Sequence, residues 1–162
     1  AAMTGHQVYS TLHTNSAIGT IPRLLDLGIK PDMLAGNIIG IVAQRLIRKV
    51  CPHCREAAPA SDFERKLLRQ PLDADITLYH ARGCDQCSHT GYRGRLSVME
   101  LLKMDADMDE LVARRATRSE LLALALDKGF KPLSEDGVRR VLEGVTTLDE
   151  VSRVIDLTDR LV

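Results

Sequence analysis

The sequences CPHC (residues 51–54) and CDQC (residues 84–87) hold all four cysteines of the chain. A Cys-x-x-Cys turn directs two thiolates at one point, and two such turns supply the four soft, tetrahedral ligands that a structural Zn2+ prefers. Because the segment between the two pairs is longer than in common zinc ribbons, we expect a long loop that the metal closes at its base. The predicted zinc ligands are Cys51, Cys54, Cys84 and Cys87.

Other interpretations of the cysteines are open: two disulfides, four unrelated buried thiols, or a site in which a histidine replaces one cysteine. Two disulfides would need an oxidising compartment, whereas residues 1–6 (AAMTGH) show no basic segment followed by the apolar core of a signal peptide, which predicts a cytoplasmic protein. His53 and His89 lie beside the cysteine pairs and are the alternative ligands, although four thiolates already complete a zinc shell.

The composition excludes several classes of function. Lys and Arg number 22, as do Asp and Glu, so no overall charge attracts nucleic acid or an anionic membrane. With no Trp, two Phe and three Tyr, the chain has few rings on which bases would stack. Its apolar runs are far shorter than the roughly 20 residues that span a bilayer. We therefore expect no nucleic-acid partner, and membrane association only through other proteins.

The residues on both sides of the cysteine segment alternate between apolar and polar side chains. Residues 42–50 lead directly into the first cysteine, and residues 95–102 follow the second pair with the same alternation. A period of two predicts strands, and we expect these two to pair. The cysteine segment is then one long hairpin connection, in which residues 61–72 are expected to be helical and residues 76–79 to form a short strand.

A polar turn is predicted near the start of the chain. Residues 7–13 (QVYSTLH) have the composition of a buried strand, residues 14–16 (TNS) are good helix caps, and a helix is expected to continue to Gly28. His13 would then lie at the carboxyl end of a strand, where α/β proteins usually bind ligands. A structural histidine is the alternative interpretation of this residue.

From residue 103 onward the sequence predicts four short amphipathic helices, which suggest a small bundle. Two of them are expected to begin at capping boxes, Thr117-x-x-Glu120 and Thr147-x-x-Glu150.

Together, these motifs resemble the secretion ATPases that drive type II secretion and type IV pilus assembly. The resemblance covers essentially the whole chain and includes the His box, the tetracysteine element and the C-terminal end of that family. The matching segments are residues 4–6 (TGH), 10–15 (STLHTN), 43–46 (AQRL), 51–54 (CPHC), 84–87 (CDQC), 90–95 (TGYRGR), 135–137 (EDG), 144–148 (GVTTL) and 150–151 (EV).

The resemblance implies an α/β fold: the C-terminal part of a RecA-like P-loop ATPase core with a tetracysteine zinc-binding insertion and a small all-helical C-terminal bundle. The implied divisions are residues 1–50 (core with the His box), 51–87 (zinc insertion), 88–102 (return strand of the core) and 103–162 (helical subdomain). His13 is implied to reach the γ-phosphate region of ATP, and His6 to support it.

The same resemblance implies a longer enzyme. No segment fits Gly-x-x-x-x-Gly-Lys-Ser/Thr, and no acidic strand precedes the His box. We therefore expect a fragment that is inactive by itself and a parent that binds ATP and Mg2+.

That parent is implied to be a hexamer, peripheral to the inner membrane through a membrane platform and cytoplasmic anchoring proteins. The motifs do not distinguish secretion, pilus assembly and DNA uptake. They also leave open whether the zinc loop is a structural staple or a docking surface. The alternative from another functional class is a free-standing zinc-binding adaptor without enzymatic activity, which the four cysteines alone permit.

Overall fold

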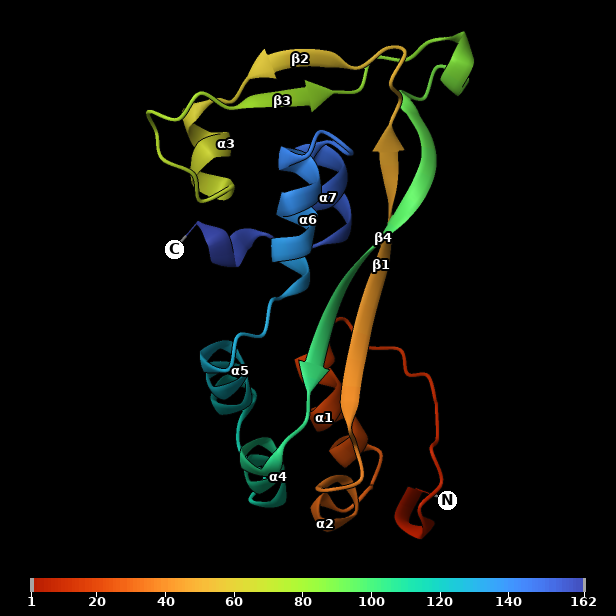
Figure 1. The fold of residues 1–162 in the computed structure, drawn as a ribbon, viewed down its shortest axis with the longest axis vertical. Coiled ribbons are helices and arrows are strands. Elements are labelled where there is room, and N and C mark those ends of the chain that lie inside the picture. The colour runs from red at the N-terminus through yellow and green to blue at the C-terminus, as the bar shows by residue number, and fades with distance from the viewer. Residues whose placement is uncertain (1, 162) are drawn as a thin grey trace. The chain divides into compact units, whose positions relative to one another are not determined.

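The longest feature of the computed structural model, which describes residues 2–161, is a two-stranded ribbon (Figure 1). β1 (Gly40–Val50) pairs with β4 (Tyr92–Lys103), and the two strands run in opposite directions. The predicted pairing of residues 42–50 with residues 95–102 is confirmed. The alternation of apolar and polar residues predicts this pairing, because one face of the ribbon buries apolar side chains and the other face is exposed.

The chain divides into two compact units, and both strands of the ribbon pass from one into the other. Unit 1 comprises residues 1–43 and 99–132, and unit 2 comprises residues 44–98 and 133–162. The four helices predicted after residue 103 are present, two in unit 1 and two in unit 2. The first two pack against N-terminal helices, whereas the third packs against the fourth and against β3.

Unit 1 is built mainly from helices. α1 contacts α5, α2 contacts α4, and α4 contacts α5. Its elements are the 3-10 helix η1 (Ala2–Thr4), α1 (Ala17–Asp26), α2 (Pro31–Leu34), α4 (Ala106–Ala113) and α5 (Arg118–Asp127), with the adjoining ends of β1 and β4. The apolar core includes Ile18, Ile21, Leu34, Leu102, Met104, Met108, Val112, Leu121 and Ala125.

The predicted strand at residues 7–13 is wrong. These residues have no regular secondary structure and all are exposed. A strand needs a hydrogen-bonded neighbour, and within the described part of the chain no strand pairs with this segment. The polar turn after it is confirmed, because Ser16 caps α1 by accepting a hydrogen bond from the Gly19 backbone N–H at 3.1 Å.

Unit 2 contains the cysteine segment, residues 51–87. Its elements are β2 (Glu56–Pro59), α3 (Asp62–Leu67), β3 (Thr77–His80), the 3-10 helices η2 (Asp85–Cys87) and η3 (Thr158–Arg160), α6 (Leu133–Leu142) and α7 (Leu148–Val154). β2 and β3 form a second antiparallel pair, which agrees with the predicted strand at residues 76–79. The predicted helix at residues 61–72 ends earlier, before Arg69, whose φ of 53° is incompatible with a continuing helix.

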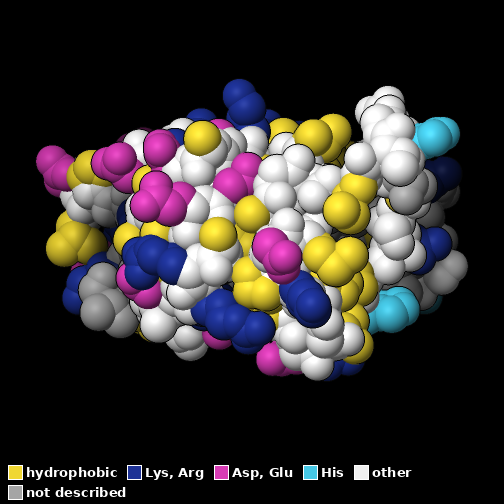
Figure 2. All heavy atoms as spheres, turned by 90° about the horizontal axis from the view of Figure 1, so that it is seen from below, with side chains coloured by type: hydrophobic (Ala, Val, Ile, Leu, Met, Phe, Trp, Pro, Cys, Tyr) yellow, Lys and Arg dark blue, Asp and Glu magenta, His cyan; other side chains and the backbone are white. Residues whose placement is uncertain are grey.

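Hydrophobic side chains are also present on the surface. Figure 2 views the molecule from the end where α2 and α4 lie in Figure 1, and hydrophobic groups gather there among charged ones. Exposed large apolar residues of unit 1 include Tyr9, Met33, Ile39 and Leu101. No helix among residues 2–161 has the length and hydropathy needed to cross a membrane.

Candidate functional sites: the cysteine cluster and the histidine turn

The four cysteines converge on one point in unit 2, as the sequence predicts. Their sulfur atoms all lie within 4.8 Å of one another. The Sγ atoms are 4.0 Å apart for Cys51 and Cys84, 3.8 Å for Cys54 and Cys87, and 3.8 Å for Cys84 and Cys87. A disulfide requires about 2.0 Å, whereas four sulfurs at about 2.3 Å from a tetrahedral Zn2+ lie about 3.8 Å from one another. The spacing therefore fits a four-cysteine metal centre and excludes disulfides in this structure.

Backbone N–H groups surround the sulfurs. Gly83 donates to the Cys54 sulfur, Gly91 donates to the Cys87 sulfur, and Cys84 also donates to the Cys87 sulfur, each at 3.2 Å. Donors of this kind stabilise thiolates, which are the form that binds a metal.

Without a bound metal, the pKa values of two of the thiols are shifted in opposite directions. Burial raises the pKa of Cys84 to about 11, and the neighbouring thiols add to this effect. Burial also raises the pKa of Cys87, but the N–H groups of Cys84 and Gly91 outweigh it and lower that pKa to about 6. A bound Zn2+ would displace the remaining thiol protons, because metal-bound sulfur is deprotonated.

Two glycines allow the chain to close around the cysteines. Gly83 has a φ of 113° and Gly91 a φ of 76°, which lie in the region that side chains with a Cβ rarely adopt. A Cβ at Gly83 would lie 2.6 Å from the His89 carbonyl oxygen, and a Cβ at Gly91 would lie 2.7 Å from the Ala81 Cβ. Both positions therefore require glycine if the cluster is to keep this geometry.

The two alternative histidine ligands are not part of the cluster. Among the described residues, the group of candidate metal ligands at this site consists of the four cysteines. His89 instead places its Nε2 atom 3.0 Å from the Asp85 carboxylate, and His53 is exposed. The cysteines alone supply a full tetrahedral shell.

The second candidate site is the turn before α1 in unit 1, which carries His13. The His13 side chain is exposed and lines an open hollow of about 470 Å3 together with Asn15, Arg23 and Arg118. His6 is also exposed, and its Nδ1 atom lies 3.1 Å from the Thr4 hydroxyl. The hollow presents one imidazole, two guanidinium groups and the Asp26 carboxylate to solvent. The two arginines outnumber the single carboxylate, and guanidinium groups are donors that suit an anionic ligand.

The turn itself is held by buried neighbours. The Thr14 and Thr20 hydroxyls lie 2.9 Å apart, and the Thr20 hydroxyl donates to the Ser16 carbonyl at 3.3 Å. At the next residue, the Ala17 N–H donates to the Glu100 carboxylate of β4 at 2.5 Å. Sequence reasoning missed Glu100, although the alternation of the strand places it on the same face as Val98 and Leu102, which are buried.

A buried carboxylate in unit 2 also escaped the sequence analysis. Thr147 caps α7 as predicted, but Glu150 does not complete the capping box. Its carboxylate instead accepts from the backbone N–H of Arg48 at 2.9 Å and from the guanidinium groups of Arg48 and Arg153 at 2.6–3.0 Å. The Arg48 guanidinium also lies 4.1 Å from the ring centre of Tyr92. This network stabilises the base of the cysteine hairpin.

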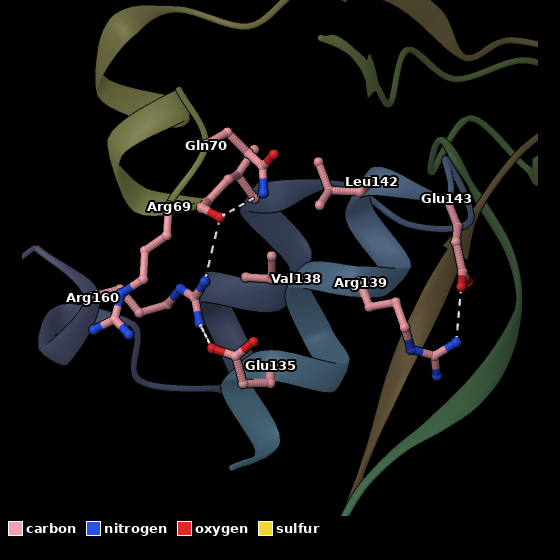
Figure 3. Close-up of a pocket in the computed structure, with 9 residues that line it drawn as sticks. Arg69, Gln70, Glu135, Val138, Arg139, Leu142, Glu143 and Arg160 are labelled. Carbon is pink, nitrogen blue, oxygen red and sulfur yellow. Dashed lines mark hydrogen bonds and ion pairs between the residues drawn. The ribbon is translucent and has the colours of Figure 1, made fainter. Parts of the chain in front are cut away.

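A hollow between α3 and α6 is lined by charged side chains that already have partners (Figure 3). Arg160 is buried, pairs with Glu135, and donates to the Leu67 carbonyl at 2.8 Å. Arg139 pairs with Glu143 at 2.8 Å. Arg160 therefore fastens the C-terminal 3-10 helix to α3, and both guanidinium groups already pair with carboxylates.

The relatives of the chain decide its family. Residues 1–153 match the profile of a family described as type II/IV secretion system protein. The chain belongs to this family. The resemblance drawn from the sequence motifs is thus confirmed.

Three relatives illustrate the match. The chain is 47% identical over 154 residues to type II secretion system protein E of Pseudomonas aeruginosa, covering 95% of this chain and 30% of that protein. It is 41% identical over 160 residues to the type IV pilus assembly ATPase TfpB of Acinetobacter baylyi, covering 98% and 27%. It is 40% identical over 153 residues to the type IV pilus assembly ATPase PilB of Thermus thermophilus, covering 93% and 17%. The chain therefore spans at most about 30% of the length of these relatives.

Proposed function

We propose that this chain is the C-terminal part of an ATP-hydrolysing motor that powers type II secretion or type IV pilus assembly. The observation that carries the proposal is the four-cysteine cluster with zinc-like sulfur spacing, in a chain that matches the type II/IV secretion family over residues 1–153. Two relatives of 40–41% identity are named as ATPases. Because the chain covers only part of their length, the activity is assigned to the full-length parent.

In this proposal the chain has four segments, two of which belong to one core. Residues 1–50 and 88–102 belong to the RecA-like core, residues 51–87 form the zinc insertion, and residues 103–162 supply the C-terminal helices. The parent binds ATP and Mg2+, assembles as a hexamer, and acts on an inner-membrane platform from the cytoplasmic side. The phosphate-binding and Mg2+-binding segments lie outside this chain, so the chain alone does not hydrolyse ATP.

His13 is proposed to act at the γ-phosphate, with His6 in a supporting role. An exposed imidazole donates to a phosphate oxygen, and charge stabilisation with positioning is most of what phosphoryl transfer requires. The hollow beside His13 is also lined by Arg23 and Arg118, two cations against the one carboxylate of Asp26, which favours an anionic ligand.

The test is ATP hydrolysis by the purified full-length parent. His13→Ala should reduce kcat by about 100-fold, as loss of one preorganised donor does, while nucleotide affinity changes little. His6→Ala should have a smaller effect. The matched control is His53→Ala, an exposed histidine of unit 2 that is not among the candidate metal ligands, which should leave kcat unchanged. Turnover by His13→Ala equal to that of wild type would refute the role of His13.

The absence of ATP binding and turnover in the wild-type parent would refute the motor and favour the alternative function, a zinc-binding adaptor. The four-cysteine cluster is the observation that supports this alternative, since a structural zinc site needs no enzyme around it.

The zinc loop is proposed to dock a partner of the secretion or pilus machine through α3. Phe63 is 61% exposed on this helix, and Lys66 is exposed on the same helix. Arg65 and Arg69 are less suitable for the test, because they donate to the carbonyls of Ala74 and Asp159 and so stabilise the fold itself. Phe63→Ser and Lys66→Glu in the parent should impair secretion or piliation with ATP hydrolysis kept. Normal secretion and piliation would leave the loop as a structural staple.

A further inference from the structure

A buried carboxylate, Glu100, lies behind the histidine turn in unit 1. It belongs to β4 and is only 4% exposed. Burying a carboxylate is unfavourable unless polar groups compensate. Its Oε1 atom accepts a hydrogen bond from the Ala17 N–H at 2.5 Å, across 83 residues of sequence. The residue is therefore one side of a specific contact between the strand and the start of α1.

The contact falls at the point where the turn becomes a helix. Ser16 is the N-cap of α1, and Ala17 is the first helical residue. The first backbone N–H groups of a helix have no partner within the helix and carry partial positive charge, so a carboxylate there is favourable. Two of these groups are now occupied, since Gly19 donates to the Ser16 hydroxyl and Ala17 donates to Glu100.

The hydrogen bonds of residues 14–17 hold the turn in place and leave His13 exposed beside it. Thr14 is tied to Thr20 through their hydroxyls, and Ser16 and Ala17 are fixed by the bonds just described. His13 directly precedes this anchored segment, and its side chain remains exposed in the hollow. A reorientation of the turn by about 1 Å would misplace the imidazole, and misplacements of that size reduce catalytic rates by up to about 100-fold.

We propose that Glu100 is a positioning residue for His13: by holding the start of α1 through Ala17, it sets the orientation of the turn that presents the imidazole to the nucleotide. The inference rests on the proposed role of His13 in the full-length ATPase. Glu100 acts through the backbone and does not contact ATP in this proposal.

The experiment is a double-mutant cycle in the full-length parent, with kcat and KM for ATP measured separately. Glu100→Ala should lower kcat by about 10-fold or more with KM changed less than about twofold, because the turn shifts while other contacts to the nucleotide remain. Glu100→Gln retains an oxygen that accepts from Ala17 N–H and should recover kcat to within about threefold of wild type. The double variant with His13→Ala should be no slower than His13→Ala alone, because both changes remove the same effect.

The stability control is Val112→Ala. Val112 is buried in α4 of the same unit and does not line the hollow, so this change loosens the core without touching the turn. It should lower the thermal midpoint but leave kcat near wild type at 25 °C. An additive loss of kcat in the Glu100→Ala, His13→Ala double variant, or no rescue by Glu100→Gln, would overturn the positioning role.

Hydrogen exchange separates this inference from the proposed function. In Glu100→Ala, the amides of residues 17–19 should exchange at least about 10-fold faster than in wild type, whether or not the parent hydrolyses ATP. Unchanged exchange would overturn the anchoring of the turn by Glu100. If exchange accelerates but the wild-type parent shows no turnover, the anchoring stands and the assignment of the motor fails, together with the catalytic purpose of the anchor.

Discussion

Replacement of Glu150 tests whether a network of buried ion pairs stabilises unit 2. The carboxylate is fully buried and receives both guanidinium groups and a backbone N–H. Glu150→Ala removes the acceptor for all of them. Breaking a buried ion pair from one side costs about 3–5 kcal/mol, and the lower value applies here because Arg48 and Arg153 are 42% and 57% exposed and regain water. We expect a loss of about 3 kcal/mol in the free energy of unfolding.

The lowered pKa of Glu150 corresponds to a stability contribution of the same order. Burial raises the pKa of Glu150, but the hydrogen bonds from Arg153 and Arg48 outweigh it and lower the pKa from 4.5 to about 2. At about 1.4 kcal/mol per pH unit, this difference corresponds to roughly 3 kcal/mol. Because the pKa is lower in the folded state, the contribution is complete above pH 4.5 and is lost as the pH falls towards about 2.

The assay is urea unfolding of the zinc-loaded chain, followed by circular dichroism and tyrosine fluorescence from pH 7 down to pH 3. Glu150→Gln should lose less stability at pH 7 than Glu150→Ala. Because acid also releases zinc from the cysteines, the loss on acidification is compared with that of wild type at each pH, and Glu150→Gln should show the smaller loss. Glu143→Ala is the matched control, since its carboxylate is 40% exposed and pairs with arginines at the surface, where such pairs contribute about 1 kcal/mol or less. A loss for Glu150→Ala no larger than for this control would refute the reasoning.

Three further predictions concern the metal and the local folds. Chelation of the metal, or Cys87→Ser, should release one Zn2+ per chain, measured by a colorimetric zinc assay, and should lower the thermal midpoint of unit 2; wild-type chain that contains no zinc after expression with the metal would contradict the site. Gly91→Ala should weaken zinc retention in a competition assay with a chelator, because its Cβ would overlap that of Ala81; retention as tight as in wild type would show that the turn relaxes easily. Thr117→Ala removes the cap of α5 and should cost about 1 kcal/mol in thermal unfolding, whereas an unchanged midpoint would show that solvent replaces the cap.

Sequence periodicity and spacing were sufficient where a local pattern decides the structure. The alternation around the cysteine segment predicted the pairing of β1 with β4, because apolar residues on one face of a strand need a buried side. The two Cys-x-x-Cys turns predicted the cluster, since two thiolates per turn point the same way. The capping box at Thr117 and Glu120 is present as predicted, because it depends only on residues three apart.

The errors arose where distant residues decide the structure. Residues 7–13 have a strand-like composition, but composition states only that a segment suits a pleated surface, and none of the described residues pairs with them. Glu150 has the local pattern of a capping box, yet Arg48, 102 positions away, takes its carboxylate. No local sequence motif predicts the hydrogen bonds between Arg48 and Glu150.

The chain passes from unit 1 to unit 2, returns to unit 1 and ends in unit 2, and this order affects how the protein folds. Residues 44–98 of unit 2 are synthesised before residues 99–132, which complete unit 1. Unit 2 is complete only after residues 133–162 have been synthesised. Contacts such as Val50 N–H to the Val145 carbonyl, 3.0 Å long, close large loops and form slowly. The cysteine hairpin needs no later residues for its four sulfurs. We therefore expect zinc capture to be an early event during translation, after which the hairpin serves as the template on which α6 and α7 assemble.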